Sequence, residues 1–150
     1  MSCDKEIKIA PLTESDLYAV SELEKANFSL PFSEKALNEL FTNTSWHFLG
    51  AKQDNVLVGY IIFYTIIDET EIVNVCVRSD LRGLGIGRAL LTRTVALCRE
   101  GGTKKLMLEV RKSNSVAIKL YESLGFIPVG VSKNHYKLPT EDAILMNLEF

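Results

Sequence analysis

The sequence predicts an α/β domain in which a mixed β-sheet is covered by helices, and three observations support this fold class. The chain has 150 residues, 47% of them hydrophobic, which is enough for one substantial core. Its apolar patterns follow the order β-α-α-β-β-β-α-β-α-β-β, which combines an antiparallel hairpin with parallel crossovers. No repeat, low-complexity tract or linker interrupts residues 1–150, so we expect a single domain.

The first half begins with a short strand at residues 8–10, followed by two helices. Residues 13–16, Thr-Glu-Ser-Asp, form a capping box that predicts a helix to about Lys25. The segment 27–32 breaks the helical pattern. Ser33 then caps a second, short helix whose apolar residues share one side.

An antiparallel hairpin follows the two helices. Residues 46–53 and 56–66 are strand-like runs, and Asp54-Asn55 between them is a tight-turn signal. A third run at residues 71–77 leads into a glycine-rich stretch. These runs predict three consecutive strands.

The second half alternates helices with strands. A helix that begins near Gly87 has apolar residues at helical spacing and ends at Gly101-Gly102. Ser113 is expected to cap the next helix. The remaining elements are expected at residues 105–110, 113–124, 126–132 and 143–148.

The most informative motif lies between a strand and a helix: Arg82-Gly83-Leu84-Gly85-Ile86-Gly87-Arg88. Its glycines allow a ligand to approach the backbone closely, and the helix start leaves N–H groups unpaired. With an arginine at each end, the stretch predicts a cradle for a phosphate or pyrophosphate of a nucleotide-like ligand. It lacks the lysine of a P-loop and the third glycine of a dinucleotide fingerprint. A plain glycine-rich turn is the alternative.

Charge is distributed unevenly along the chain, although the formal net charge is only −2. Residues 1–75 carry five Lys or Arg and twelve Asp or Glu, whereas residues 76–150 carry twelve and seven. The basic half contains the glycine-rich stretch, so we expect it to hold an anionic cofactor while the acidic half attracts a cationic substrate. Solvated helix faces are the alternative. Nucleic-acid binding is not expected, because the basic residues are not interleaved with aromatic residues.

Cysteine, histidine and hydropathy patterns argue against several other classes. Cys3, Cys76 and Cys98 form no C-x-x-C pair and only two histidines are present, so neither a disulfide framework nor a metal site is expected. Cys76 and Cys98 are predicted to be small core residues. The polar start and the lack of a long apolar run predict a cytoplasmic protein without a membrane partner.

The glycine-rich motif, together with the element order, resembles the GNAT superfamily of acetyl-CoA-dependent N-acetyltransferases, over almost the whole chain. Within it, the chain is similar to the RimI-type branch, which acetylates the N-terminal α-amine of a ribosomal protein. This resemblance implies an enzyme that uses acetyl-CoA as co-substrate and acts on a protein N-terminus, that of a small-subunit ribosomal protein beginning with alanine. The stretches that carry the resemblance are residues 82–88, 108–111 with Ser113-Asn114, 120–126 and 141–143.

Glu109 and Tyr121 are the candidate catalytic residues. Attack on a thioester requires a neutral amine, so the site needs a proton acceptor and then a donor for the departing thiolate. Glu109 interrupts an apolar strand, where a carboxylate would be partly desolvated; a solvated carboxylate paired with Arg111 is the alternative. Tyr121 is a protonated phenol at neutral pH, or simply a core tyrosine. The resemblance implies that Glu109 accepts the proton and Tyr121 donates one.

The cofactor is expected to lie along one strand and over the glycine-rich motif. The free backbone edge of Val75, Cys76 and Val77 would pair with the pantetheine amides, and a backbone N–H would polarise the thioester carbonyl. Complete pairing with the next strand is the alternative. Asn114 is either a helix cap or, as the resemblance implies, a coenzyme A contact.

Two departures from the RimI-type pattern concern the acceptor. The branch commonly has adjacent tyrosines where this chain has Asn134-His135-Tyr136, and a tryptophan where it has Phe32 after Pro31. We expect these positions to line the acceptor groove, with His135 a groove or surface residue. The alternatives are an acetyltransferase for lysine side chains or a small amine, and a non-catalytic acyl-CoA-binding module.

Overall fold

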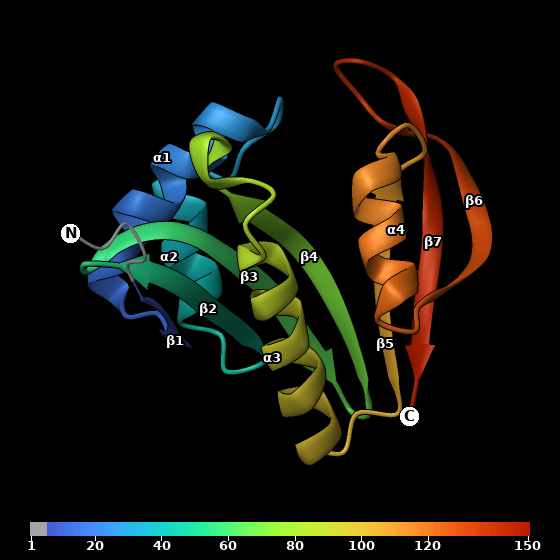
Figure 1. Cartoon of the computed structure of the whole chain (residues 1–150), viewed down its shortest axis with the longest axis horizontal. Helices are drawn as coiled ribbons and strands as arrows, with labels where there is room; N and C mark the ends of the chain where they lie inside the picture. The colour runs from blue at the N-terminus through green and yellow to red at the C-terminus, as the bar shows by residue number, and fades with distance from the viewer. Residues whose placement is uncertain (1–5) are drawn as a thin grey trace.

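The computed structural model describes residues 6–150 and contains a seven-stranded sheet in the order β1-β2-β3-β4-β5-β7-β6. Four α-helices cover the sheet, which confirms the predicted mixed α/β fold (Figure 1). The elements are β1 Ile7–Pro11, α1 Leu17–Asn27, α2 Glu34–Phe41, β2 Trp46–Gln53, β3 Val56–Ile66, β4 Glu69–Val77, α3 Ile86–Glu100, β5 Lys105–Arg111, α4 Ser115–Ser123, β6 Ile127–Tyr136 and β7 Glu141–Glu149.

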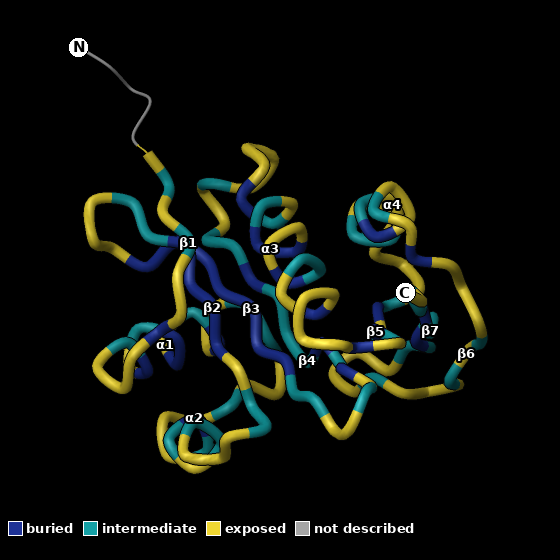
Figure 2. Tube along the Cα trace, turned by 90° about the horizontal axis from the view of Figure 1, so that it is seen from below, coloured by how far each residue is buried: buried dark blue, intermediate teal, exposed yellow. Residues whose placement is uncertain are grey.

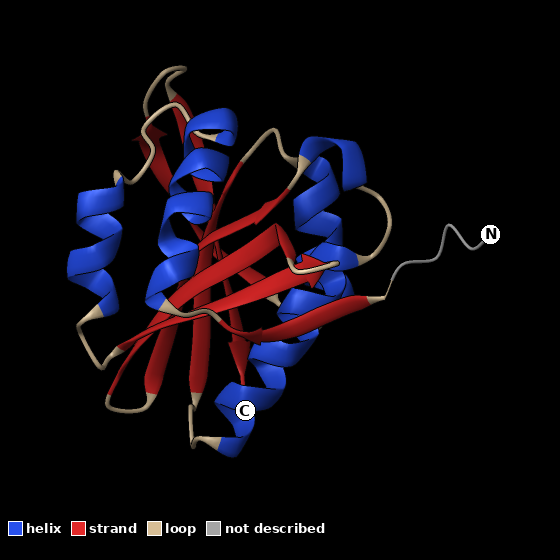
Figure 3. Cartoon of the chain, turned by 90° about the vertical axis from the view of Figure 1, so that its left-hand side faces the viewer, coloured by secondary structure: helices blue, strands red, loops and turns tan. Residues whose placement is uncertain are grey.

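The helices form one layer on each side of the sheet. Figure 2 shows α1 and α2 on one face and α3 and α4 on the other, with the buried residues between them. On the first face, Leu17 and Val20 of α1 and Leu37 of α2 are fully buried. On the second face, Leu90 and Leu91 of α3 are fully buried. The strands change direction across the sheet, as Figure 3 shows, because β-sheets twist.

Local signals placed the first elements correctly. Ser33 Oγ accepts a 3.1 Å hydrogen bond from Ala36 N at the start of α2, so the predicted cap is confirmed. Asp54 and Asn55 both have positive φ angles, 52° and 64°, as the tight turn between β2 and β3 requires. Cys76 and Cys98 are buried, as predicted. Cys3 and the rest of residues 1–5 lie outside the described residues.

The sheet opens between its two central parallel strands. Residues 69–72 of β4 pair with residues 105–108 of β5, and beyond them the strands diverge (Figure 1). The β3–β4 register shifts at this point and leaves Val73 without a direct partner on β3. Such a bulge bends its strand and increases the local twist, so it explains why β4 turns away from β5. Helices α3 and α4 both begin at the open end.

Three predicted boundaries are corrected by the structure. Helix α4 begins at Ser115, and Asn114 caps it, because Asn114 Oδ1 accepts a 3.2 Å hydrogen bond from Ala117 N. The backbone N–H of Ser113 instead donates to Glu141 Oε2 at 2.6 Å. Strand β6 extends to residue 136 and β7 starts at residue 141, because these strands pair beyond their apolar segments. Within residues 6–150, no helix is long and apolar enough to cross a membrane.

Candidate active site

The opening between β4 and β5 is the floor of a groove with a volume of about 610 Å³. One wall is the loop between α1 and α2. The other is formed by the facing end of β5, by α4 and by the β6–β7 connection. The groove therefore joins segments from both halves of the sheet at the end where α3 and α4 begin.

Glu109 faces this groove from β5. Its neighbours Leu108 and Val110 are buried, because alternate residues of a strand point to opposite faces. The Glu109 side chain itself is 35% exposed, so its apolar neighbours shield it only in part. Its partner is His135, whose Nε2 lies 2.5 Å from Glu109 Oε2, and not Arg111.

Tyr121 lies on α4 and contributes to both the core and the groove. Its ring packs against Phe126, with the ring centroids 5.8 Å apart, and the residue is only 9% exposed. Burial, with a smaller effect of Tyr136, raises the pKa of Tyr121 to about 12. The phenol is therefore protonated at neutral pH and can act as a proton donor.

The glycine-rich stretch forms the turn that starts α3. Gly83 and Gly85 have φ angles of 79° and 89°, a conformation that favours glycine, and a Cβ on either residue would meet no atom within 4 Å. Helix geometry leaves the N–H groups of Ile86, Gly87 and Arg88 without acceptors inside the helix. The open space at Gly83 and Gly85, next to these donors in the chain, fits the predicted anion cradle.

The two flanking arginines are both bound to other parts of the protein. Arg82 Nε donates to Val77 O at 3.1 Å, and its Nη2 donates to Asn27 Oδ1 on α1. Arg88 Nη2 donates to Ser123 Oγ on α4 at 2.9 Å. The arginines thus anchor the loop, while the backbone supplies the most direct anion donors.

The remaining loop residues and Asn114 occupy different environments. Leu84 is 70% exposed at the tip of the turn, whereas Ile86 is buried in the core. Asn114 caps α4 and also lines the groove, so a role as helix cap is compatible with a role as coenzyme A contact.

One edge of β4 is available for a ligand. The backbone N–H of Arg78 donates a 2.8 Å hydrogen bond to β3. Because backbone groups alternate in direction, Cys76 also turns its groups to β3, whereas Val75 and Val77 turn theirs to the opening. Complete pairing with β5 is excluded, since that pairing ends at Ile72.

A buried carboxylate that the sequence reasoning missed positions the α1–α2 wall. Glu24 is 0% exposed on α1, and its Oε1 accepts a 2.9 Å hydrogen bond from Phe32 N. Its Oε2 accepts from Asn74 Nδ2 on β4 at 2.8 Å and from the hydroxyl of Tyr60 on β3. The signal was present: Glu24 follows Leu17 by seven residues on the apolar side of the helix.

The opposite wall is held by Arg111. Its guanidinium donates to Pro139 O at 3.0 Å and to Lys137 O at 3.2 Å, and it pairs with Glu141 Oε1 at 3.3 Å. The same guanidinium lies 4.5 Å from the centroid of the Tyr136 ring. These contacts fix the β6–β7 connection beside Glu109 on β5.

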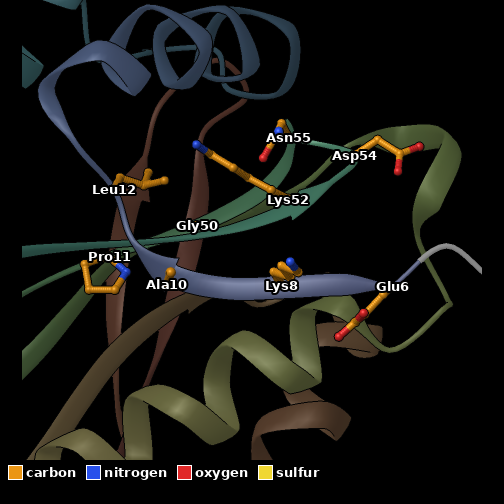
Figure 4. A pocket seen from close by; sticks show the side chains of 9 residues that line it. All are labelled: Glu6, Lys8, Ala10, Pro11, Leu12, Gly50, Lys52, Asp54 and Asn55. Atoms are coloured by element: carbon orange, nitrogen blue, oxygen red, sulfur yellow. The ribbon is translucent and has the colours of Figure 1, made fainter.

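A second hollow of about 460 Å³ lies at the β1 edge of the sheet (Figure 4). Its Lys52 is paired with Asp16 at 2.8 Å. Strands β2 and β3 separate this hollow from β4, and it contains neither candidate catalytic residue. We therefore assign the site to the groove between β4 and β5.

The fold and the groove define the class of acyl-coenzyme A N-acyltransferases: an opened parallel strand pair, a glycine-rich helix start and, beside them, a carboxylate and a protonated phenol. Residues 17–126 match the model of the acetyltransferase (GNAT) family. The chain belongs to this family, which uses acetyl-CoA.

Curated relatives and a solved structure cover nearly all of the chain. A [ribosomal protein bS18]-alanine N-acetyltransferase from Salmonella typhimurium is 36% identical over 146 residues, which are 93% of this chain and 95% of that protein. The protein of the same name from Haemophilus ducreyi is 33% identical, covering 93% and 98%. The crystal structure of the ribosomal-protein-S18-alanine N-acetyltransferase from Escherichia coli has a TM-score of 0.90 at 33% identity, covering 96% of this chain and 94% of that one.

Proposed function

We propose that this protein transfers an acetyl group from acetyl-CoA to the α-amine of a ribosomal protein whose first residue is alanine. We place this reaction in the cytoplasm. The observation that carries the proposal is that Glu109 and the protonated phenol of Tyr121 line one groove. The names of the relatives support the ribosomal protein as acceptor. The reaction needs neither a nucleic-acid nor a membrane partner.

Acetyl-CoA would enter from the open end of the groove. The exposed backbone groups of Val75 and Val77 would pair with the pantetheine amides, as an added strand would. The backbone at residues 83–88 would bind the pyrophosphate, where the dipole of α3 favours negative charge. Arg82, Arg88 and Asn114 would hold the loop and the start of α4 around it.

The proton transfers of the reaction define the roles of Glu109 and Tyr121. Conversion of an ammonium ion and a thioester into an amide and a thiol removes two protons from the nitrogen; one remains on the thiol and one is released to solvent. Glu109 accepts a proton from the ammonium ion so that the amine can attack the thioester carbonyl. Tyr121 donates its proton to the departing thiolate; the second proton lost by the nitrogen restores the phenol, and Glu109 releases the first to solvent.

An α-amine suits a base of this kind. Its reference pKa is about 8, compared with about 10.4 for lysine, so a larger fraction is already neutral at pH 7. The first half of the chain has twelve acidic and five basic residues, a surplus of seven acidic residues. This surplus would attract a positively charged peptide.

The test is an acetyl-CoA assay with a basic peptide that begins with alanine. We expect the acetyl group on the terminal nitrogen, located by fragment mass spectrometry. A matched peptide with a blocked N-terminus and free lysines should not react. Acetyl groups found mainly on lysine side chains would contradict the α-amine assignment while leaving the acetyl-CoA site in place.

A further inference from the structure

We propose that His135 is the positioning residue of the catalytic base, a role that rests on the proposed function of Glu109. The imidazole holds one carboxylate oxygen and leaves the other for the amine. The pair, rather than Glu109 alone, then determines how the base is oriented toward the amine.

The backbone is shaped to bring His135 to Glu109. Strand β7 lies between β5 and β6, so the imidazole must reach across a strand. The β6–β7 register shifts between Ser132 and Tyr136, which inserts extra residues into β6. Asn134 within this bulge has a φ of 53°, and its N–H donates to Asp142 Oδ1 at 2.8 Å. Bulges of this kind redirect side chains near active sites.

The contacts of the imidazole indicate which ring nitrogen carries the proton. His135 Nε2 lies 2.5 Å from Glu109 Oε2 as an ion pair, and because a carboxylate cannot donate, we place the proton on this nitrogen. His135 Nδ1 then accepts from Ser132 Oγ, at a longer 3.4 Å. The ring also packs edge-on against Tyr136, with the centroids 4.9 Å apart. Three contacts therefore fix the orientation of the imidazole.

The other charges near the pair are already engaged. Arg111 is bound to Glu141, and Asp142 accepts from the backbone of Asn134. Lys137 Nζ donates to a backbone oxygen in the β6 bulge. The nearby phenols stay neutral because their pKa values are raised, and Glu71 accepts a hydrogen bond from one of them. The groups concerned are Arg111 on β5, Tyr136 and Lys137 at the end of β6, Glu141 and Asp142 on β7, Tyr121 on α4, Tyr64 on β3 and Glu71 on β4.

The experiment compares kcat and KM of His135→Phe, His135→Gln and Glu109→Gln for acetylation of the peptide. Phenylalanine keeps the ring and its packing but removes the donor, whereas glutamine keeps a donor. The control is His47→Gln: His47 on β2 stacks on Phe63, with the centroids 5.2 Å apart, and does not line the groove. Acetyl-CoA affinity is measured for each variant.

We expect His135→Phe to lower kcat/KM at neutral pH roughly tenfold, because a hydrogen bond to a charged group is lost. His135→Gln should stay within about threefold of the wild type, because glutamine can still donate to the carboxylate of Glu109. The kcat/KM of His47→Gln and all acetyl-CoA affinities should match the wild type.

Two results would overturn the inference, and they are distinguishable. If Glu109→Gln loses activity but His135→Phe does not, or if His135→Gln loses as much activity as His135→Phe, the positioning role is wrong and the proposed function remains. If Glu109→Gln retains full activity, Glu109 is not the base, and both the base assignment and the role of His135 fail.

Discussion

The backbone N–H of Phe32 donates a 2.9 Å hydrogen bond to Glu24 Oε1, which ties the loop between α1 and α2 to the interior of the protein. Glu24 is completely buried, and its other oxygen is shared by Asn74 and Tyr60. Burial and the Glu24 carboxylate raise the pKa of Tyr60, so that phenol stays a donor. One carboxylate therefore joins a wall of the groove to β3 and β4.

Glu24→Ala should destabilise the fold and loosen that wall. One buried donor, Tyr60, and two partly buried donors, Phe32 and Asn74, lose their acceptor, and we expect the free energy of unfolding in urea to fall by roughly 3 kcal/mol. The KM for the peptide should rise. Glu22→Ala is the matched control, because Glu22 forms an exposed ion pair with Lys25 on the same helix. Equal stability of the two variants would show that the network is unimportant.

Gly85→Ala should weaken acetyl-CoA binding, and Gly102→Ala should not. Both glycines have positive φ, 89° and 86°, and an added Cβ meets no atom at either, so each variant should lose a similar stability of about 1 kcal/mol. Only the methyl group at residue 85 would occupy the proposed pyrophosphate site. Calorimetric titration should show at least a fivefold loss of affinity for Gly85→Ala. The same affinity in both variants would remove the loop from the cofactor site.

Tyr121→Phe and Tyr136→Phe should separate the roles of the two phenols in the groove. Burial raises the pKa of each to about 12, so both are protonated at neutral pH. Tyr136 lies under the guanidinium of Arg111 in the wall of the groove that includes the β6–β7 connection. We expect Tyr121→Phe to lower kcat by roughly a hundredfold, and Tyr136→Phe to act mainly on the peptide KM. The reverse pattern would exchange the assignments.

Because the pKa of Tyr121 is high, its ionisation should not produce a loss of kcat between pH 8 and 10.

Glu141→Gln should change how stability depends on pH. Hydrogen bonding by Ser113, with Arg111 nearby, holds the pKa of Glu141 below its ordinary value of 4.5. A carboxyl with a depressed folded-state pKa stabilises the fold above its unfolded value, and this contribution disappears as pH falls through the folded value. The variant should therefore be less stable than the wild type at pH 7, and the difference should shrink below pH 4.5. A pH-independent difference would mean that charge is not the cause.

Much of the fold follows from short-range chemistry. The capped start of α2 and the hairpin at Asp54 and Asn55 depend on residues within a few positions of one another, and both were predicted. The glycine-rich stretch was predicted to lead into a helix, and the structure adds that Gly83 and Gly85 have positive φ. The start of α4 was misplaced because Ser113 and Asn114 are both good caps, and a distant contact with Glu141 separates them.

The sequence pointed to the candidate residues of the site but not to their side-chain partners. The alternation of β5 and the helical pattern of α4 place Glu109 and Tyr121, and the resemblance gives them roles. The sequence also contained Arg111 two residues from Glu109, which made an ion pair between them reasonable. In the structure their side chains have different partners, His135 and Glu141.

The sequence by itself determined the element types and the glycine turn before α3, because each depends on local periodicity or residue type; the roles proposed for Glu109 and Tyr121 come from the family resemblance. Only the tertiary structure decided where β4 leaves β5, which donors surround Glu24 and that His135 reaches Glu109. These features join residues far apart in the chain through a bulge or a buried polar contact. No local pattern encodes such pairings, because they arise only when the strands take their order in the sheet.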